Sequence, residues 1–185
     1  MSLIEKTTTP VGSYAPDFEL VGIDEEVHHL YRYLKRWRGV GVIFLCNQCP
    51  DVLSYVDRLK QIQARFQNKG ITVVGINANH ANQYHEESLK SMKEFARKNK
   101  LNFPYLWDAT QDVASSFGAQ KAPEAFLIDN RGILRYRGRI DDNAQDPEAV
   151  KVHYLQNAIA ALLLGESISP KSTEAIGCTL KWRNH

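Results

Sequence analysis

The sequence is poor in cysteine and has no long apolar run. Three cysteines in 185 residues are too few for a disulfide-stapled scaffold, and an odd number leaves at least one unpaired. No run approaches the roughly 18 apolar residues of a membrane-spanning helix, and residues 1–9 lack the apolar stretch of a signal peptide. An excess of one charge is also missing, because 23 lysines and arginines face 21 aspartates and glutamates. We therefore expect a cytoplasmic protein without a membrane or nucleic-acid partner.

No repeat, low-complexity segment or linker divides the chain, so one domain is expected. We expect a flexible N-terminus at residues 1–10, a domain at 11–165 and a tail at 166–185 packed on that domain. Apolar patterning predicts strands at 18–23, 27–30, 40–45, 71–76, 105–107, 125–128 and 133–136. Helical periodicity predicts helices from Pro50 to before Gly70, and at 87–100, 111–117 and 147–164. This order indicates an α/β fold with a mixed sheet and helices on both faces.

A Cys-x-x-Cys pair, Cys46 and Cys49, stands where the apolar strand 40–45 gives way to a helix. Pro50 suits the first helical position, which makes Cys49 the N-cap residue. Free backbone N–H groups and the helix dipole stabilise a thiolate there, and Asp51 opposes that effect. The pair can bridge if the turn brings the two Cα atoms within about 7 Å. The pattern favours redox chemistry, and the alternative is a pair of buried apolar cysteines.

A proline, Pro123, directly precedes the predicted strand 125–128. Proline cannot donate a hydrogen bond to a sheet, so its position at a strand start needs an explanation. A cis bond between Ala122 and Pro123 provides one. A plain turn is the alternative, and the upstream cysteine pair favours the cis bond.

Four further motifs resemble the thioredoxin superfamily, in particular its redoxin branch of AhpC/TSA peroxiredoxin-like proteins. They are Ala-Pro-Asp-Phe-Glu-Leu at 15–20, Phe-Pro-Tyr-Leu-Trp-Asp at 103–108, Tyr-Arg-Gly-Arg-Ile-Asp-Asp at 136–142 and Ile-Gly-Cys-Thr-Leu-Lys-Trp at 176–182. The last three resemble one peroxiredoxin-like subgroup. The resemblance covers residues 11–182 and implies a thioredoxin-like three-layer α/β/α sandwich. It also implies a mixed central sheet, an N-terminal strand pair, a C-terminal tail, and Pro123 as a cis-proline facing the cysteines.

The resemblance leaves two assignments of the nucleophile open. In a thioredoxin register Cys46 attacks and Cys49 resolves. Cys49-Pro50 instead resembles the peroxidatic Cys-Pro of peroxiredoxins, with Cys46 where those proteins carry a threonine. The helix begins directly after Cys49, so we favour Cys49 as the nucleophile and Cys46 as its resolving partner. Ala122, Pro123 and Pro50 are then expected to shape the substrate-binding surface.

Two departures from the peroxiredoxin pattern favour dithiol–disulfide exchange over peroxide reduction. Glu124 stands in the region where peroxiredoxins place an activating arginine, and Cys46 replaces their threonine. A peroxide-bound transition state needs such donors, whereas disulfide exchange needs a thiolate, access and a partner thiol. We therefore predict a thiol–disulfide oxidoreductase. A thiol-dependent peroxidase is one alternative, and a non-catalytic or metal-handling module, with His80 or His85, is another.

Cys178, in the predicted tail, has two interpretations. It is either a resolving cysteine that meets oxidised Cys49 or a buried anchor for the tail, and we favour the anchor because nothing in the sequence places the tail over the site. No cofactor and no metal are expected. The expected partners are protein or small-molecule disulfides, or peroxides, together with an external thiol as electron donor.

Overall fold

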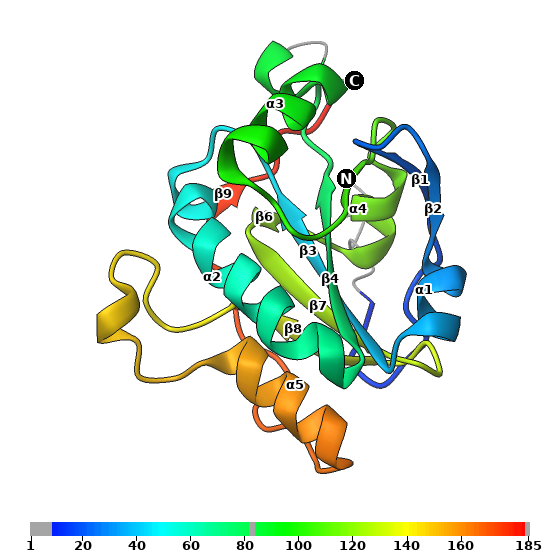
Figure 1. Cartoon of the computed structure of the whole chain (residues 1–185), viewed down its shortest axis with the longest axis vertical. Helices are drawn as coiled ribbons and strands as arrows, with labels where there is room; N and C mark the ends of the chain where they lie inside the picture. The colour runs from blue at the N-terminus through cyan, green and yellow to red at the C-terminus, as the bar shows by residue number, and fades with distance from the viewer. Residues whose placement is uncertain (1–8, 82–83, 184–185) are drawn as a thin grey trace, which may run out of the picture.

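The computed structural model describes residues 9–81 and 84–183, and residues 1–8 of the expected flexible N-terminus lie outside the described residues. A seven-stranded sheet forms the centre, in the order β2-β1-β5-β4-β3-β7-β8, and β6 and β9 form a second, two-stranded sheet (Figure 1). The strands are β1 Glu19–Gly22, β2 Val27–His29, β3 Gly39–Leu45, β4 Ile71–Asn77, β5 Tyr105–Trp107, β6 Lys121–Ala122, β7 Glu124–Asp129, β8 Leu134–Gly138 and β9 Cys178–Thr179.

Helices cover both faces of the large sheet. They are α1 Leu30–Arg36, α2 Pro50–Phe66, α3 Leu89–Asn99, α4 Asp112–Phe117 and α5 Tyr154–Leu164, with 3₁₀ turns at Gln67–Lys69, His85–Glu87 and Pro147–Ala149. Figure 1 shows α2 and α5 in front of the sheet and α4 behind it. Helix α4 lies in the connection from β5 to β7, which are separated in the sheet by β4 and β3. The predicted α/β class with a mixed sheet is confirmed.

The core lies against the central strands. Every residue of β3 and β4 is buried, as expected for apolar runs covered on both faces. On the α4 side, the rings of Phe44, Phe117 and Phe126 meet edge to face with centroids 5.1 to 5.7 Å apart. Such contacts add to the area that these rings bury. They fix α4 to the centre of the sheet.

Strand register brings three chain segments to one edge of the sheet. Because β3 and β4 are parallel, with Leu45 opposite Asn77, their carboxyl ends coincide. Strand β7 is antiparallel to β3 and pairs Glu124 with Phe44, so β7 begins at this same edge. The residues after β3, those after β4 and the loop before β7 therefore meet there. This is the edge at which open α/β sheets collect reactive groups.

The prediction of one helix over 147–164 is wrong in its first half. A short 3₁₀ turn, Pro147–Ala149, is followed by extended residues, and α5 begins only at Tyr154. Asp142 explains the break, because its carboxylate accepts the Lys151 N–H at 2.9 Å and its own N–H donates to the Val152 carbonyl at 3.2 Å. These bonds hold residues 151–152 outside any helix. The sequence patterns also do not predict α1 or the tail strand β9.

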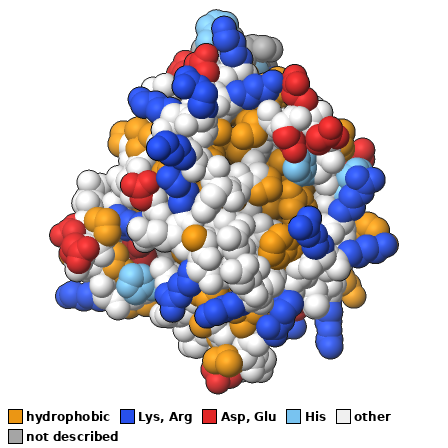
Figure 2. Space-filling view, in the orientation of Figure 1, with side chains coloured by type: hydrophobic (Ala, Val, Ile, Leu, Met, Phe, Trp, Pro, Cys, Tyr) orange, Lys and Arg blue, Asp and Glu red, His pale blue; other side chains and the backbone are white. Residues whose placement is uncertain are grey.

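Charged side chains are interspersed on the face shown in Figure 2, with smaller hydrophobic areas between them. Within residues 9–81 and 84–183, no helix has the length and apolar character needed to cross a membrane.

Candidate functional site

The turn between β3 and α2 carries two of the three cysteines. Cys49 is the N-cap residue of α2 in an extended conformation (φ −76°, ψ 123°), and Pro50 is the first helical residue, both as predicted. Its sulfur therefore lies at the positive end of a 17-residue helix. Asp51 adds a carboxylate in the first turn of α2.

Cys49 is joined by a disulfide to Cys178, and Cys46 is a free, buried cysteine. The Cα atoms of Cys49 and Cys178 lie 6.1 Å apart, although 129 residues separate them in the sequence. The expected Cys46–Cys49 pairing is therefore not the one in the structure, and the interpretation of Cys178 as a plain anchor is wrong. The physical reason is the course of the tail, which β9 carries to the site.

Strand β9 brings Cys178 to the cis-proline loop. It pairs antiparallel with β6, with Cys178 opposite Ala122 and Thr179 opposite Lys121. The Ala122–Pro123 peptide bond is cis, as the sequence predicts. The Ala122 carbonyl oxygen also lies 3.5 Å from the Cys49 sulfur. The predicted substrate-binding residues Ala122 and Pro123 thus flank the disulfide.

Glu124 holds the cis-proline loop in place. Its carboxylate is buried and accepts the backbone N–H groups of Gln120 and Lys121 at 2.9 and 3.2 Å. Its other oxygen forms an ion pair with Arg137 at 3.3 Å, and the Arg137 guanidinium also lies over the Phe126 ring. The acid at this position therefore fixes the backbone of β6.

Cys46 is packed next to a buried carboxylate. It is 2% exposed, and Glu87, from the 3₁₀ turn His85–Glu87, is wholly buried. The Glu87 carboxylate accepts the Asn47 backbone N–H at 3.0 and 3.2 Å and the Asn77 amide N–H at 2.6 Å. The Tyr105 hydroxyl donates to the Asn47 side chain at 2.8 Å. This network ties the cysteine turn to the ends of β4 and β5.

Burial sets the protonation of this group. Burial, and next the negative charge of Glu87, raise the pKa of the Cys46 thiol to about 12, and Lys181 opposes the shift. Burial also raises the pKa of the Glu87 carboxyl, against the hydrogen bonds from Asn47 and Asn77. Cys46 is therefore a thiol rather than a thiolate at neutral pH, and it is a poor nucleophile.

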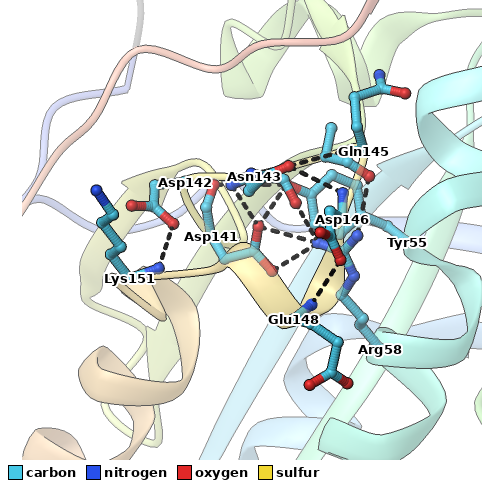
Figure 3. A network of polar contacts seen from close by, with 10 residues as sticks. Tyr55, Arg58, Asp141, Asp142, Asn143, Gln145, Asp146, Glu148 and Lys151 are labelled. Carbon is cyan, nitrogen blue, oxygen red and sulfur yellow. Dashed lines mark hydrogen bonds and ion pairs between the residues drawn. The ribbon is translucent and has the colours of Figure 1, made fainter.

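A second polar network anchors α2 to the loop after β8. Arg58, on α2, contacts the Asp141 carboxylate at 2.8 Å and donates to the carbonyls of Asn143 and Ala144 (Figure 3). The Tyr55 hydroxyl donates to the same carboxylate at 2.7 Å. Both members of the ion pair are buried, so the pairing is needed to offset their desolvation. It fixes the helix that carries Cys49.

One group of side chains at the site resembles a metal-ligand set. The ligand atoms of Cys49, Asp51 and Cys178 lie within 4.8 Å of one another. Both sulfurs are bonded to each other, so in this form they do not offer two thiolates. Among the described residues, His80 and His85 do not join this group.

Sequence reasoning missed the residues that hold the turn and the tail. Glu87 appears there only as the first residue of a predicted helix, and Asn47 only as a residue between the cysteines. One signal was available, since Asn77 ends a run of apolar strand residues on the buried strand β4. A polar residue in that place needs a buried partner. The identity of that partner, Glu87, is a matter of tertiary contacts.

The sheet, the cis-proline loop and the disulfide together define an oxidoreductase of thioredoxin-like fold whose chemistry is that of a thiol–disulfide couple. The chain belongs to the AhpC/TSA family, which it matches over residues 11–137. It is 30% identical, over 80% of its length and 79% of the relative's, to the thiol-disulfide oxidoreductase ResA of Geobacillus thermodenitrificans. These matches confirm the predicted superfamily branch and enzyme class.

Two solved structures are similar over almost the whole chain. A hypothetical protein of Sinorhizobium meliloti has a TM-score of 0.89 and 30% identity, covering 97% of this chain and 98% of that one. An uncharacterized conserved protein of Geobacillus kaustophilus has a TM-score of 0.88 and 34% identity, covering 95% and 94%. The fold is therefore shared with both over almost the whole chain.

Proposed function

We propose that Cys49 and Cys178 are the redox couple of this thiol–disulfide oxidoreductase and that Cys49 attacks the substrate. The disulfide between an N-cap cysteine and a cysteine of the tail strand is the observation that carries the proposal. The comparisons support the enzyme class, and the choice of couple rests on the geometry.

Reduction of a substrate disulfide by Cys49 and Cys178 takes two steps. The Cys49 thiolate attacks one sulfur of a substrate disulfide, the substrate S–S bond breaks, and one substrate sulfur leaves as a thiolate. The Cys178 thiolate then attacks the Cys49 sulfur of the mixed disulfide and releases the second substrate thiol. Two electrons pass to the substrate, and the enzyme is left with the Cys49–Cys178 disulfide. An external dithiol reduces it again.

Environment favours Cys49 over Cys46 as the nucleophile. The helix dipole and the free N–H groups of the first turn of α2 stabilise a thiolate at Cys49. Cys46 is buried beside the Glu87 carboxylate, which disfavours its thiolate. Cys178 lies in the partly exposed strand β9, so it is a better resolving residue than the buried Cys46.

Disulfides fit this site better than peroxides do. The Glu124 carboxylate is engaged by backbone N–H groups and Arg137, and the threonine of peroxiredoxins is replaced by Cys46. We propose protein disulfides as substrates and an external thiol as the electron donor. The cytoplasmic location expected from the composition stays a prediction, which fractionation of the source cells tests.

The experiment is a set of single serine substitutions assayed by reduction of a protein disulfide, with dithiothreitol as donor. Cys49→Ser is expected to abolish turnover. Cys178→Ser, reduced and then freed of dithiothreitol before substrate is added, is expected to accumulate a Cys49–substrate mixed disulfide that peptide mapping identifies. Cys46→Ser, the matched control, is expected to keep most of the activity. Full activity of Cys49→Ser, or loss of activity in Cys46→Ser alone, would overturn the proposal. Faster consumption of hydrogen peroxide than of disulfide would make the protein a peroxidase.

A further inference from the structure

The tail segment 177–181 runs along β6 beside Cys49, and its residues Cys178–Thr179 form the strand β9. Besides the β6–β9 pairing at Cys178 and Thr179, the Leu180 N–H donates to the Gln120 carbonyl at 3.0 Å. Leu180 itself is 3% exposed. The segment therefore uses the backbone edge of the cis-proline loop in the way one strand uses another.

Side chains from two other elements hold the far end of this segment. Asn79, after β4, accepts the Lys181 N–H at 2.9 Å, and the His80 N–H donates to the Lys181 carbonyl at 2.9 Å. The Gln111 amide donates to that same carbonyl at 2.9 Å. These bonds do not involve the disulfide.

With the segment in place, Cys49 is 4% exposed. A thiolate must approach the substrate sulfur directly, so access limits disulfide exchange. Exchange with an external disulfide therefore requires the segment to move away from β6. Its departure leaves the Gln120 carbonyl and the edge of β6 at Ala122 without a strand partner, whereas the Lys121 N–H keeps its bond to Glu124. Backbone groups left in this way bind another strand or water.

Gly177 shows what kind of chain fits against this edge. A Cβ atom at position 177 would lie 2.3 Å from the Ala122 carbonyl oxygen and 2.7 Å from its carbonyl carbon. Real Cβ atoms do not approach backbone this closely. Ala122 is 1% exposed and belongs to β6, so it cannot move aside without disturbing the core. Only glycine fits directly before the cysteine in this position.

We propose that segment 177–181 is an internal ligand of the active site, and that a substrate protein binds by replacing it. The substrate segment is extended, pairs with Lys121 and Ala122, and carries glycine directly before its reactive cysteine. This inference rests on the proposed function, because it takes Cys49 as the attacking residue. The returning tail then delivers Cys178 to the mixed disulfide.

Release of the tail is tested by the rate at which iodoacetamide alkylates Cys49 in the reduced full-length protein, followed by mass spectrometry. Gly177→Ala is expected to raise this rate about tenfold or more, because overpacking of this size costs enough to unseat the segment. Thr179→Ala is the matched control, since it removes an exposed side chain of the same strand, together with the exposed hydrogen bond that it accepts from the Lys121 ammonium at 3.1 Å, and keeps the backbone pairing. It is expected to stay within about twofold of the wild type. An unchanged rate in Gly177→Ala would overturn the proposal.

A second variant keeps this test decisive if Gly177→Ala folds poorly. Gln111→Ala removes the bond to the Lys181 carbonyl and the bond that the Arg183 N–H donates to Gln111 at 2.9 Å, as well as a bond to the Ala78 carbonyl at 2.7 Å. None of these bonds involves a cysteine. If Gly177→Ala does not fold, Gln111→Ala decides the test: faster alkylation of Cys49 supports the proposal, and an unchanged rate contradicts it.

Glycine selection is tested with two peptides, Ile-Gly-Cys-Thr-Leu and Ile-Ala-Cys-Thr-Leu, each activated as a mixed disulfide with thionitrobenzoate. The full-length Cys178→Ser protein serves as the enzyme. Attack by Cys49 forms the Cys49–peptide disulfide and releases coloured thionitrobenzoate. The glycine peptide is expected to react about tenfold faster or more, and equal rates would overturn the selection.

The two proposals fail in different ways. If Cys49→Ser is inactive but Gly177→Ala and Gln111→Ala are alkylated like the wild type, the redox couple stands and the internal ligand is wrong. If both variants are alkylated faster but Cys49→Ser keeps full activity, the segment covers Cys49 and the assigned nucleophile is wrong.

Discussion

The carboxylate of Glu87 accepts the backbone N–H of Asn47 with both oxygens, at 3.2 and 3.0 Å, in a position closed to solvent. A negative charge thus stands behind the turn that carries Cys46 and Cys49. Lys181, from the tail, is the charged group that opposes the raised pKa of both Glu87 and Cys46, and the charge of Glu87 in turn raises the pKa of Tyr105 from β5. The ionisation of Cys46 is therefore set by elements far from it in the sequence.

Glu87→Gln is expected to lower the pKa of Cys46, because it removes the negative charge that, after burial, raises that pKa to about 12. The measurement is the pH dependence of Cys46 alkylation in a Cys49→Ser, Cys178→Ser background. Asp108→Asn is the control, since Asp108 is equally buried but accepts the N–H groups of Val113 and Ala114 instead. An equal change in the pKa of Cys46 in both variants would contradict a specific role for Glu87.

Glu87 also gives the folded state a pH dependence of known sign. Burial raises its pKa above the ordinary value of 4.5, so the folded state binds this proton more tightly than the unfolded state does. The corresponding stability is present below pH 4.5 and is lost as the pH rises through the raised pKa. The free energy of unfolding, measured with urea at several pH values between 4 and 8, is expected to fall less steeply with rising pH in Glu87→Gln than in the wild type. Identical slopes would contradict the raised pKa.

Asp141→Ala is expected to reduce the free energy of unfolding by about 3–5 kcal/mol, because it leaves the buried Arg58 guanidinium without its counter-charge. The measurement is chemical unfolding at pH 7. Asp57→Ala is the control, since Asp57 faces Lys60 at 3.7 Å with 87% of its side chain exposed. It is expected to change stability by about 0.5 kcal/mol or less. A loss below about 1 kcal/mol for Asp141→Ala would show that Arg58 finds another partner.

Glu124→Ala is expected to reduce the free energy of unfolding by about 3 kcal/mol, because it removes the acceptor of two backbone N–H groups and the partner of Arg137. It is also expected to speed amide hydrogen exchange at Leu180, whose N–H bonds the carbonyl of Gln120 in the same loop. The exposed Glu148 provides the control, Glu148→Ala. Destabilisation without faster exchange at Leu180 would separate Glu124 from the tail.

Local patterns predicted the elements that build the site. Residues close together in the sequence are enough to predict the apolar run of β3, the N-cap at Cys49 and the start of α2 at Pro50. The cis bond before Pro123 was predicted from its place at a strand start and from the upstream cysteines. Each of these features is specified by neighbouring residues, so the sequence is enough to find it.

The same reasoning fails where a residue outside the pattern binds the backbone of a predicted element. The apolar period over 147–164 favours one helix, but Asp142 binds residues 151–152 and delays α5 to Tyr154. The apolar period takes account only of the residues within the predicted helix. It contains no information about a partner from the preceding loop.

The sequence by itself determined a thioredoxin-like sheet with Cys49 at a helix N-terminus and Pro123 facing it. The tertiary structure alone decided that Cys178, rather than Cys46, is bonded to Cys49. The spacing of only three positions between Cys46 and Cys49 suggested that these two form the pair. The actual pair is formed because β9 docks on β6, with Gly177 against Ala122, while burial beside Glu87 keeps Cys46 protonated. Docking across 129 residues depends on backbone groups and shape, which leave no periodic trace in the chain.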